Sequence, residues 1–163
     1  MDLAEHNRLS DAEATRVLTS VCAAPRWVHE MVAGRPYVTA DDMLRTADHV
    51  LATLSVTDLD AALAGHPEIG AAPQGAAGEA SRREQSGVDA NDAALAEALA
   101  SGNRAYEEKF GRIYLVCASG RSGPELLKIL RGRLGNDPET ELAVTRAELG
   151  KINRLRLERL VSS

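Results

Sequence analysis

The sequence predicts an all-α fold, a multi-helix bundle that forms a single domain over residues 1–163. Apolar residues repeat at helical spacing along most of the chain, and Ser, Thr, Gly and Pro stand where helices are expected to begin and end. Aromatic residues make up only 3% of the chain, whereas alanine and leucine are abundant, which favours helix over sheet. A chain of 163 residues is also a size that one hydrophobic core can hold together. We expect about seven or eight helices and one irregular segment.

Four helices are predicted before the irregular segment. One opens with a capping box, in which two side chains three residues apart bond to free backbone N–H groups at the helix start. Ser10 pairs in this way with Glu13, and Thr39 followed by Asp42 marks the start of another helix. Another helix begins at a proline, whose fixed φ suits the first helical position. In order, the four helices are Asp11 to Val21, one from Pro25, one from Thr39 through Leu54, and Ser55 to Ala64.

The irregular segment covers residues 66–80, where helical periodicity is lost. It holds three glycines, two prolines and five alanines. Long loops inside compact domains are commonly either functional or disordered. The role of the part from Ala71 to Ala80 stays open, with a lid over a site as one alternative.

Three more helices are predicted after this segment. The first runs from Asn91 to Phe110 and ends at a glycine, as helices commonly do. The second starts at Pro124, and the last follows the turn at 136–138 and ends near Val161. Between them lies the apolar run Ile113 to Ala118, for which periodicity cannot separate a buried strand from the first turns of a helix.

Composition and charge exclude several classes of function. The net charge of −5 and the pI of about 5.4 argue against a nucleic-acid partner, because binding phosphates requires a basic face. We expect no membrane association, because no apolar stretch approaches the roughly 18 residues of a membrane span, and no signal peptide is recognised. A cytoplasmic location is expected by default. Cys22 and Cys117 form no metal-ligand pattern and are expected to be reduced thiols, so no metal site is predicted.

His66 is the strongest candidate for chemistry on residue type and context. It stands between a glycine and Pro67, which restricts the residue before it and so limits where the imidazole can point. Imidazole is the side chain whose ordinary pKa lies nearest neutrality, so a rigidly held histidine can transfer protons. The alternative is a solvated loop histidine. His6, His29 and His49 are expected to be structural or solvated.

Two further groups are candidates, each with a structural alternative. Glu84 and Gln85 follow two arginines, and a solvated charge cluster at a helix start would explain the carboxylate equally well. Arg154, Arg156 and Arg159 lie on the last helix, where a charged face is the structural alternative. Arg156 lies between two leucines, so its guanidinium could point inward and bind a carboxylate.

An ordered series of motifs runs along nearly the whole chain. Its members are Pro25-Arg26-Trp27-Val28, Arg35-Pro36-Tyr37, Ala47-Asp48, His66-Pro67-Glu68-Ile69-Gly70, Ser81-Arg82-Arg83-Glu84-Gln85, Asn103, Tyr106, Lys109-Phe110-Gly111, Arg131-Gly132-Arg133-Leu134 and Arg156-Leu157. In this order and spacing they resemble the 2-oxo-4-hydroxy-4-carboxy-5-ureidoimidazoline (OHCU) decarboxylases of purine breakdown. Many members of that family carry arginine at the position of Glu68 and an aromatic residue at that of Arg112.

The resemblance implies an all-α fold of the OHCU decarboxylase type, no cofactor, and a homodimer that acts on a small-molecule substrate, OHCU. It implies cofactor-independent decarboxylation of OHCU to (S)-allantoin in urate catabolism. Carried over by position, the catalytic residues are His66, Glu84 and Arg156, with Arg154 as the alternative arginine. The substrate-binding residues implied are Pro67, Ser81, Gln85, Tyr114, Leu115, Val116, Cys117 and Ala118.

Two alternatives stay open on the sequence alone. One is a related all-α enzyme that acts on another cyclic ureide, because specificity depends on pocket dimensions. The other is a helical interaction module without catalytic activity.

Overall fold

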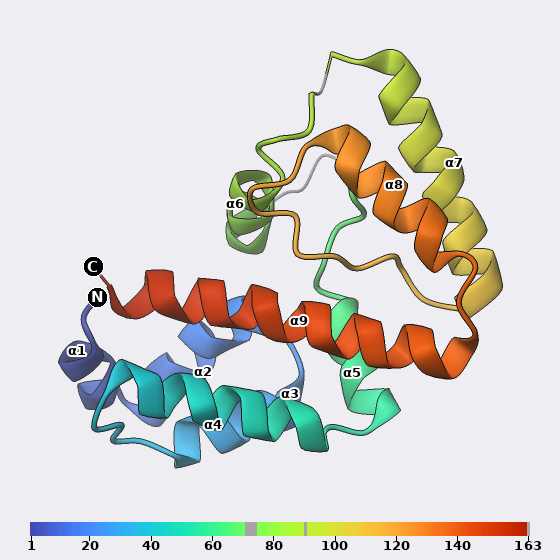
Figure 1. The fold of residues 1–163 in the computed structure, drawn as a ribbon. Coiled ribbons are helices and arrows are strands. Elements are labelled where there is room, and N and C mark those ends of the chain that lie inside the picture. The colour runs from blue at the N-terminus through green and yellow to red at the C-terminus, as the bar shows by residue number, and fades with distance from the viewer. Residues whose placement is uncertain (71–74, 90, 163) are drawn as a thin grey trace. The chain divides into compact units, whose positions relative to one another are not determined.

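The computed structural model describes residues 1–70, 75–89 and 91–162, with the backbone alone over 75–78. These described residues form helices and no β-strand, which confirms the predicted all-α class (Figure 1). The helices of the described ranges are α1 (Leu3–Arg8), α2 (Asp11–Val21), α3 (Pro25–Ala33), α4 (Ala40–Thr53), α5 (Val56–Leu63), α6 (Gly75–Glu84), α7 (Ala93–Phe110), α8 (Gly123–Arg133) and α9 (Pro138–Val161).

The chain divides into two compact units. The first comprises residues 1–65 together with the chain from residue 150 onward, and the second comprises residues 66–149. Helix α9 therefore contributes its N-terminal half to the second unit and its C-terminal half to the first. The single-domain organisation over 1–163 stays a prediction.

In the first unit, α3 packs against both α2 and α4. The fully buried Trp27 of α3 also donates its indole N–H to the Ala47 carbonyl of α4, at 3.3 Å. The predicted capping box at Ser10 of α2 is formed, and Thr39 forms one with Asp42 at the start of α4. Each cap gives backbone N–H groups of the first turn a partner that the helix itself cannot supply.

Helix α1 is an element that periodicity did not predict. Asp2 caps it through a capping box with Glu5, and it buries the side chain of His6 completely. A single polar residue on the inner face of a six-residue helix leaves no apolar repeat to detect. His6 is thus buried within a helix, so the solvated alternative for this residue is wrong.

In the second unit, α7 and α8 pack closely at two glycines. A Cβ atom at Gly102 would lie 2.5 Å from Leu130 Cδ2, and one at Gly123 would lie 2.4 Å from Leu95 Cδ2. A side chain at either glycine would require the facing leucine to move. The core of this unit gathers around the two helices: Ile69, Leu95, Leu99, Tyr106, Tyr114, Val116, Ala118, Leu126 and Leu130.

The expected loop over 66–80 is wrong in its second half, because α6 begins at Gly75. Residues 71–74 lie outside the described residues, so the open role of the segment from Ala71 to Ala80 is not settled there. The C-terminal turn of α6 buries Ser81 and Glu84.

The segment Ile113 to Ala118 is neither of the two alternatives. It lies between α7 and α8 with no helical or strand structure. Its backbone is held instead by a side chain distant in sequence, since Arg133 Nη1 donates to the Leu115 carbonyl at 2.7 Å.

Candidate functional site

The segment from His66 to Gly70 forms the first part of the candidate site. It begins directly after the turn that ends α5, and His66 and Pro67 are half-buried. Ile69 is buried in the core of the second unit, so the segment is anchored two residues beyond the proline. Gly70 has a φ of +87°, a left-handed conformation that L side chains rarely adopt.

The C-terminal end of α6 forms the second part. Glu84 is the last residue of the helix and is only 6% exposed, whereas the neighbouring Arg82 and Arg83 are exposed. Its carboxylate is therefore largely removed from solvent, and it lies at the C-terminal end of the helix and not at its start. The alternative of a solvated charge at a helix start is therefore wrong for Glu84.

One hydrogen bond joins these two segments. The Gly70 N–H donates to the side-chain Oε1 of Gln85, at 2.9 Å. Gln85 follows Glu84 directly, and Gly70 lies four residues after His66. The histidine segment and the carboxylate segment are thus fixed to each other through the Gln85 amide.

The segment from Tyr114 to Ala118 belongs to the same unit and is largely buried. Tyr114, Leu115, Val116 and Ala118 are buried and Cys117 is half-buried. The Tyr114 hydroxyl donates to the Leu126 carbonyl at 3.0 Å. Burial raises the pKa of Tyr114 well above its ordinary value, so the phenol stays protonated.

A buried ionic network supports this segment. Arg133 Nε donates to Glu141 Oε1 at 2.6 Å, and the Tyr106 hydroxyl donates to the same oxygen, also at 2.6 Å. The same guanidinium donates to the Leu115 carbonyl. Burial acts to lower the pKa of Arg133, but the hydrogen bond and charge of Glu141 outweigh it and raise that pKa. The network therefore keeps Arg133 charged where it supports the backbone of Leu115.

Arg156 lies in the first unit, on the C-terminal half of α9. It is only 7% exposed, and its Nη1 donates to the Val21 carbonyl at 3.2 Å. Arg154, by contrast, forms an ion pair with Asp48 at the surface. The two arginines of this helix therefore occupy different environments, and Arg156 is the buried one.

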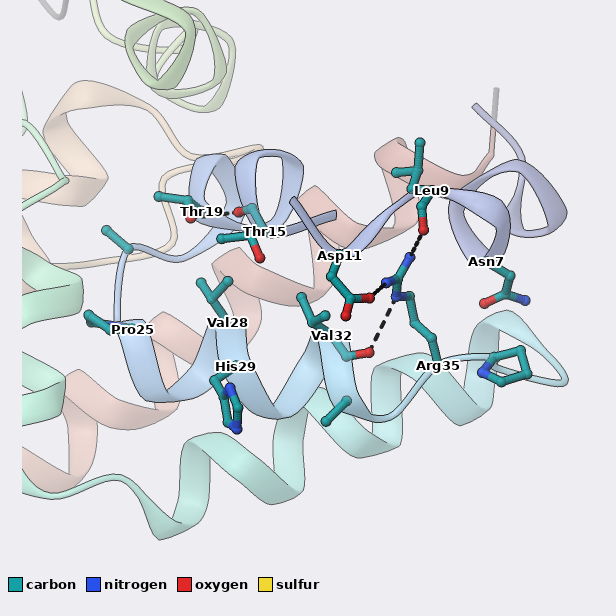
Figure 2. Close-up of a pocket in the computed structure, with 13 residues that line it drawn as sticks. Asn7, Leu9, Asp11, Thr15, Thr19, Pro25, Val28, His29, Val32 and Arg35 are labelled. Atoms are coloured by element: carbon teal, nitrogen blue, oxygen red, sulfur yellow. Dashed lines mark hydrogen bonds and ion pairs between the residues drawn. The ribbon is translucent and has the colours of Figure 1, made fainter. Parts of the chain in front are cut away.

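A cavity of about 770 Å³ lies in the first unit and contains none of the predicted site residues (Figure 2). Its lining comes from α2, α3 and the segments beside them, as the labelled side chains in Figure 2 show. Arg35 at one end bonds to Asp11 at 2.6 Å and to the Leu9 carbonyl at 2.7 Å. Through these bonds Arg35, which follows α3, is joined to the start of α2, so its role is structural.

Sequence reasoning gave no role to Asn103 or Glu141, and both prove to be buried and hydrogen-bonded. Asn103 lies on the apolar stripe of α7, four residues after Leu99 and three before Tyr106. A polar residue at a core position of a helix was the available signal. Asn103 Nδ2 donates to the Ile69 carbonyl at 3.0 Å, within the histidine segment.

Neither a membrane-spanning helix nor a metal-binding cluster is present in the described ranges. None of these helices is long and apolar enough to cross a membrane. No cluster of three or more histidine, cysteine or acidic side chains in the described part of the chain could hold a metal ion. At the start of α8, the Ser122 and Glu125 side chains cap the helix, so its free N–H groups already have partners there.

The sequence was also compared with curated proteins. It is 34% identical over 146 residues to the uric acid degradation bifunctional protein TTL of Arabidopsis thaliana, covering 86% of this chain and 45% of that protein. It is 30% identical to the 2-oxo-4-hydroxy-4-carboxy-5-ureidoimidazoline decarboxylase of Amia calva, covering 99% of this chain and 95% of that protein. The chain thus spans less than half of the first relative and nearly all of the second.

The fold was compared with solved structures. A crystal structure of OHCU decarboxylase in the presence of (S)-allantoin superimposes with a TM-score of 0.80 at 28% identity, covering 95% of this chain and all of that one. A crystal structure of (S)-allantoin synthase gives a TM-score of 0.76 at 17% identity, covering all of this chain and 54% of that one, and supports the fold alone. The model of the OHCU decarboxylase family matches residues 7–158. With the full-length match to the Amia calva protein, this shows that the chain belongs to the OHCU decarboxylase family.

Proposed function

We propose that this chain decarboxylates OHCU to (S)-allantoin, a step of urate breakdown. The observation that carries the proposal is the hydrogen bond between Gly70 and Gln85, because it fixes the segment of His66 to the helix end that bears Glu84. In a member of this family, that arrangement offers a proton-transfer group and a carboxylate from two joined segments. The names of the Amia calva relative and of the solved decarboxylase support the same substrate.

The reaction balances without an external electron acceptor. The substrate carries a hydroxyl and a carboxylate on one ring carbon, beside a C=N bond. When CO2 leaves, the electron pair of the broken C–C bond forms a double bond to the neighbouring carbon, and the C=N pair moves to nitrogen, which takes up a proton. The resulting enol gains a proton on that neighbouring carbon and loses its hydroxyl proton, which gives the ring amide carbonyl of allantoin.

The side chains would divide this work by their chemistry. His66 would deliver the proton to one face of the neighbouring carbon, which sets the configuration of the product. Glu84 would hold the imidazole or the substrate hydroxyl. Since Gln85 Oε1 already accepts from Gly70, its amide nitrogen would donate to a carbonyl of the ureido group or ring.

The remaining predicted contacts complete the proposal. Pro67 and Ser81 would contact the substrate, and the backbone of Tyr114, Leu115, Val116, Cys117 and Ala118 would bind the polar groups of its ring. Arg156 would bind an anionic or carbonyl oxygen, since its burial and planar donor set suit such a partner. We further propose that the enzyme uses no cofactor, lies in the cytoplasm and forms a homodimer.

The direct test is chiral analysis of the product. Urate oxidase and hydroxyisourate hydrolase generate OHCU in the cuvette, and the purified chain is then added. We expect release of CO2 and accumulation of (S)-allantoin at a rate far above the spontaneous one. The His66→Ala variant should lose about 10²–10⁴-fold in rate while retaining its helical circular dichroism.

Two results would contradict the proposal. Consumption of OHCU without CO2 release, or no acceleration by the purified chain, would favour an enzyme of another cyclic ureide. Full activity of His66→Ala would remove the histidine from its role.

A further inference from the structure

We propose that Asn103 is a positioning residue for His66. The inference rests on the proposed function and adds to it a residue that contacts no substrate. Asn103 would act through a single peptide group, the one between Ile69 and Gly70, which it holds together with Gln85.

The geometry of that peptide group carries the inference. Its carbonyl, from Ile69, accepts a hydrogen bond from Asn103 Nδ2 at 3.0 Å. Its N–H, from Gly70, donates to Gln85 Oε1 at 2.9 Å. Two side-chain amides, one from α7 and one from the end of α6, thus hold both polar groups of one peptide plane.

A peptide held at both polar groups cannot rotate without breaking one of the bonds. Rotation is the motion by which a short turn changes the direction of the residues before it. Pro67 already fixes its own φ and restricts His66. The side chain of Ile69 is buried in the core, and the peptide that follows it is held by two hydrogen bonds. The backbone between His66 and the core therefore has little conformational freedom.

The same peptide also couples His66 to Glu84. Gln85 is the residue after the carboxylate, so displacement of the peptide by loss of Asn103 would be felt at both segments. Misplacement of a catalytic group by about 1 Å can cost on the order of 10²-fold in rate.

The surroundings of Asn103 argue against a role in stability alone. Its side chain is 2% exposed, and its Oδ1 has no hydrogen-bond partner among the described residues. A buried amide that satisfies only one of its polar atoms carries a desolvation cost that an apolar residue of similar size would avoid. The donor of the amide is directed at the histidine segment, where it bonds to the Ile69 carbonyl.

The test uses Asn103→Leu, which keeps the approximate size of the side chain and removes the donor, together with Asn103→Ala. We expect kcat to fall about 10–10²-fold with KM changed less than about threefold, because the substrate contacts remain. The acid limb of the pH profile of kcat should also shift, since a displaced imidazole meets a different environment. The wild-type chain must first produce (S)-allantoin, so failure of the proposed function would be seen separately.

Two further variants separate position from stability. Leu130→Ala removes a buried side chain from the same core without touching the peptide. It should lower the denaturant midpoint at least as much as Asn103→Ala, with kcat within about twofold of wild type. Gly70→Ala strains the peptide from its other end through the φ of +87°, and it should lower kcat while Asn103 is intact.

The inference fails if kcat follows the denaturant midpoint across all these variants, or if Asn103→Leu folds and retains wild-type kcat and pH profile. If both Asn103 variants fail to fold, Gly70→Ala decides: wild-type kcat in that variant would overturn the proposal.

Discussion

At the scale of single residues, the two arginines of α9 lie in different environments. Arg154 and Arg156 are two positions apart, and a helix turns far enough over two residues to place them on different faces. One pairs with Asp48 at the surface, and the other is buried with a backbone carbonyl as acceptor. A surface ion pair contributes little to stability, whereas a buried guanidinium needs a partner with fixed geometry.

Kinetics should therefore separate the two arginines. We expect Arg156→Ala to lower kcat/KM by at least about tenfold, since the proposed charge-assisted hydrogen bond to the substrate would be lost. Arg154→Ala is the matched control on the same helix and should stay within about twofold, because Asp48 is its partner. A wild-type value for the first variant with a large loss for the second would reverse the assignment.

His6 makes the stability of the protein depend on pH. Its ring is completely buried, and neither nitrogen has a hydrogen-bond partner among the described residues. Burial, assisted by the charge of Arg35, lowers its pKa below the ordinary 6.5. The unfolded chain therefore binds a proton more readily than the folded one, so the contribution to stability is full above about pH 6.5 and is lost as the pH falls below it.

Urea denaturation at about pH 7.5 and about pH 5.5 measures this effect. We expect the loss of unfolding free energy between the two values to be smaller in His6→Phe than in wild type. His49→Gln, a change at an exposed histidine, should leave the loss unchanged. An equal loss in wild type and His6→Phe would assign the pH dependence to other groups.

At the scale of elements, capping and turn residues predicted most helix boundaries. Among the exceptions are α6 and the segment from Ile113 to Ala118. The capping boxes of α2 and α4 are recognisable because both partners are three residues apart. Helix α6 was not predicted because its sequence is rich in glycine and alanine, and the segment after α7 is held by Arg133, which is distant in sequence. His66 could be singled out from its neighbours, whereas the polar residue Asn103 on the apolar stripe of α7 gave no hint of its partner, because the Ile69 carbonyl lies 34 residues away.

The buried network of Arg133, Glu141 and Tyr106 should contribute strongly to the free energy of unfolding. Glu141 is buried and accepts from both Arg133 and Tyr106, so its removal leaves a buried cation without its anion. We expect Glu141→Ala to lower the free energy of unfolding by about 3–5 kcal/mol. Glu139→Ala, at an exposed position on the same turn of α9, should change it by less than about 0.5 kcal/mol. A loss below about 1 kcal/mol for Glu141→Ala would contradict the predicted strength of the network.

At the scale of the whole molecule, α9 is the element that belongs to both compact units. A helix is cooperative along its length, so melting of one half exposes unpaired backbone groups in the other. We therefore predict that the two units unfold together, in keeping with a single domain. Differential scanning calorimetry should record one transition, with the calorimetric and van't Hoff enthalpies equal. Two resolved transitions would contradict the prediction.

The peptide held by Asn103 and Gln85 has a consequence for isotope exchange. Gly70 is exposed, so burial does not shield its amide proton from solvent. Its bond to Gln85 is then what would slow replacement of that proton by deuterium. The hydrogen–deuterium exchange rate of the Gly70 amide, followed by nitrogen-15 NMR, therefore measures how often the histidine segment opens in the absence of substrate.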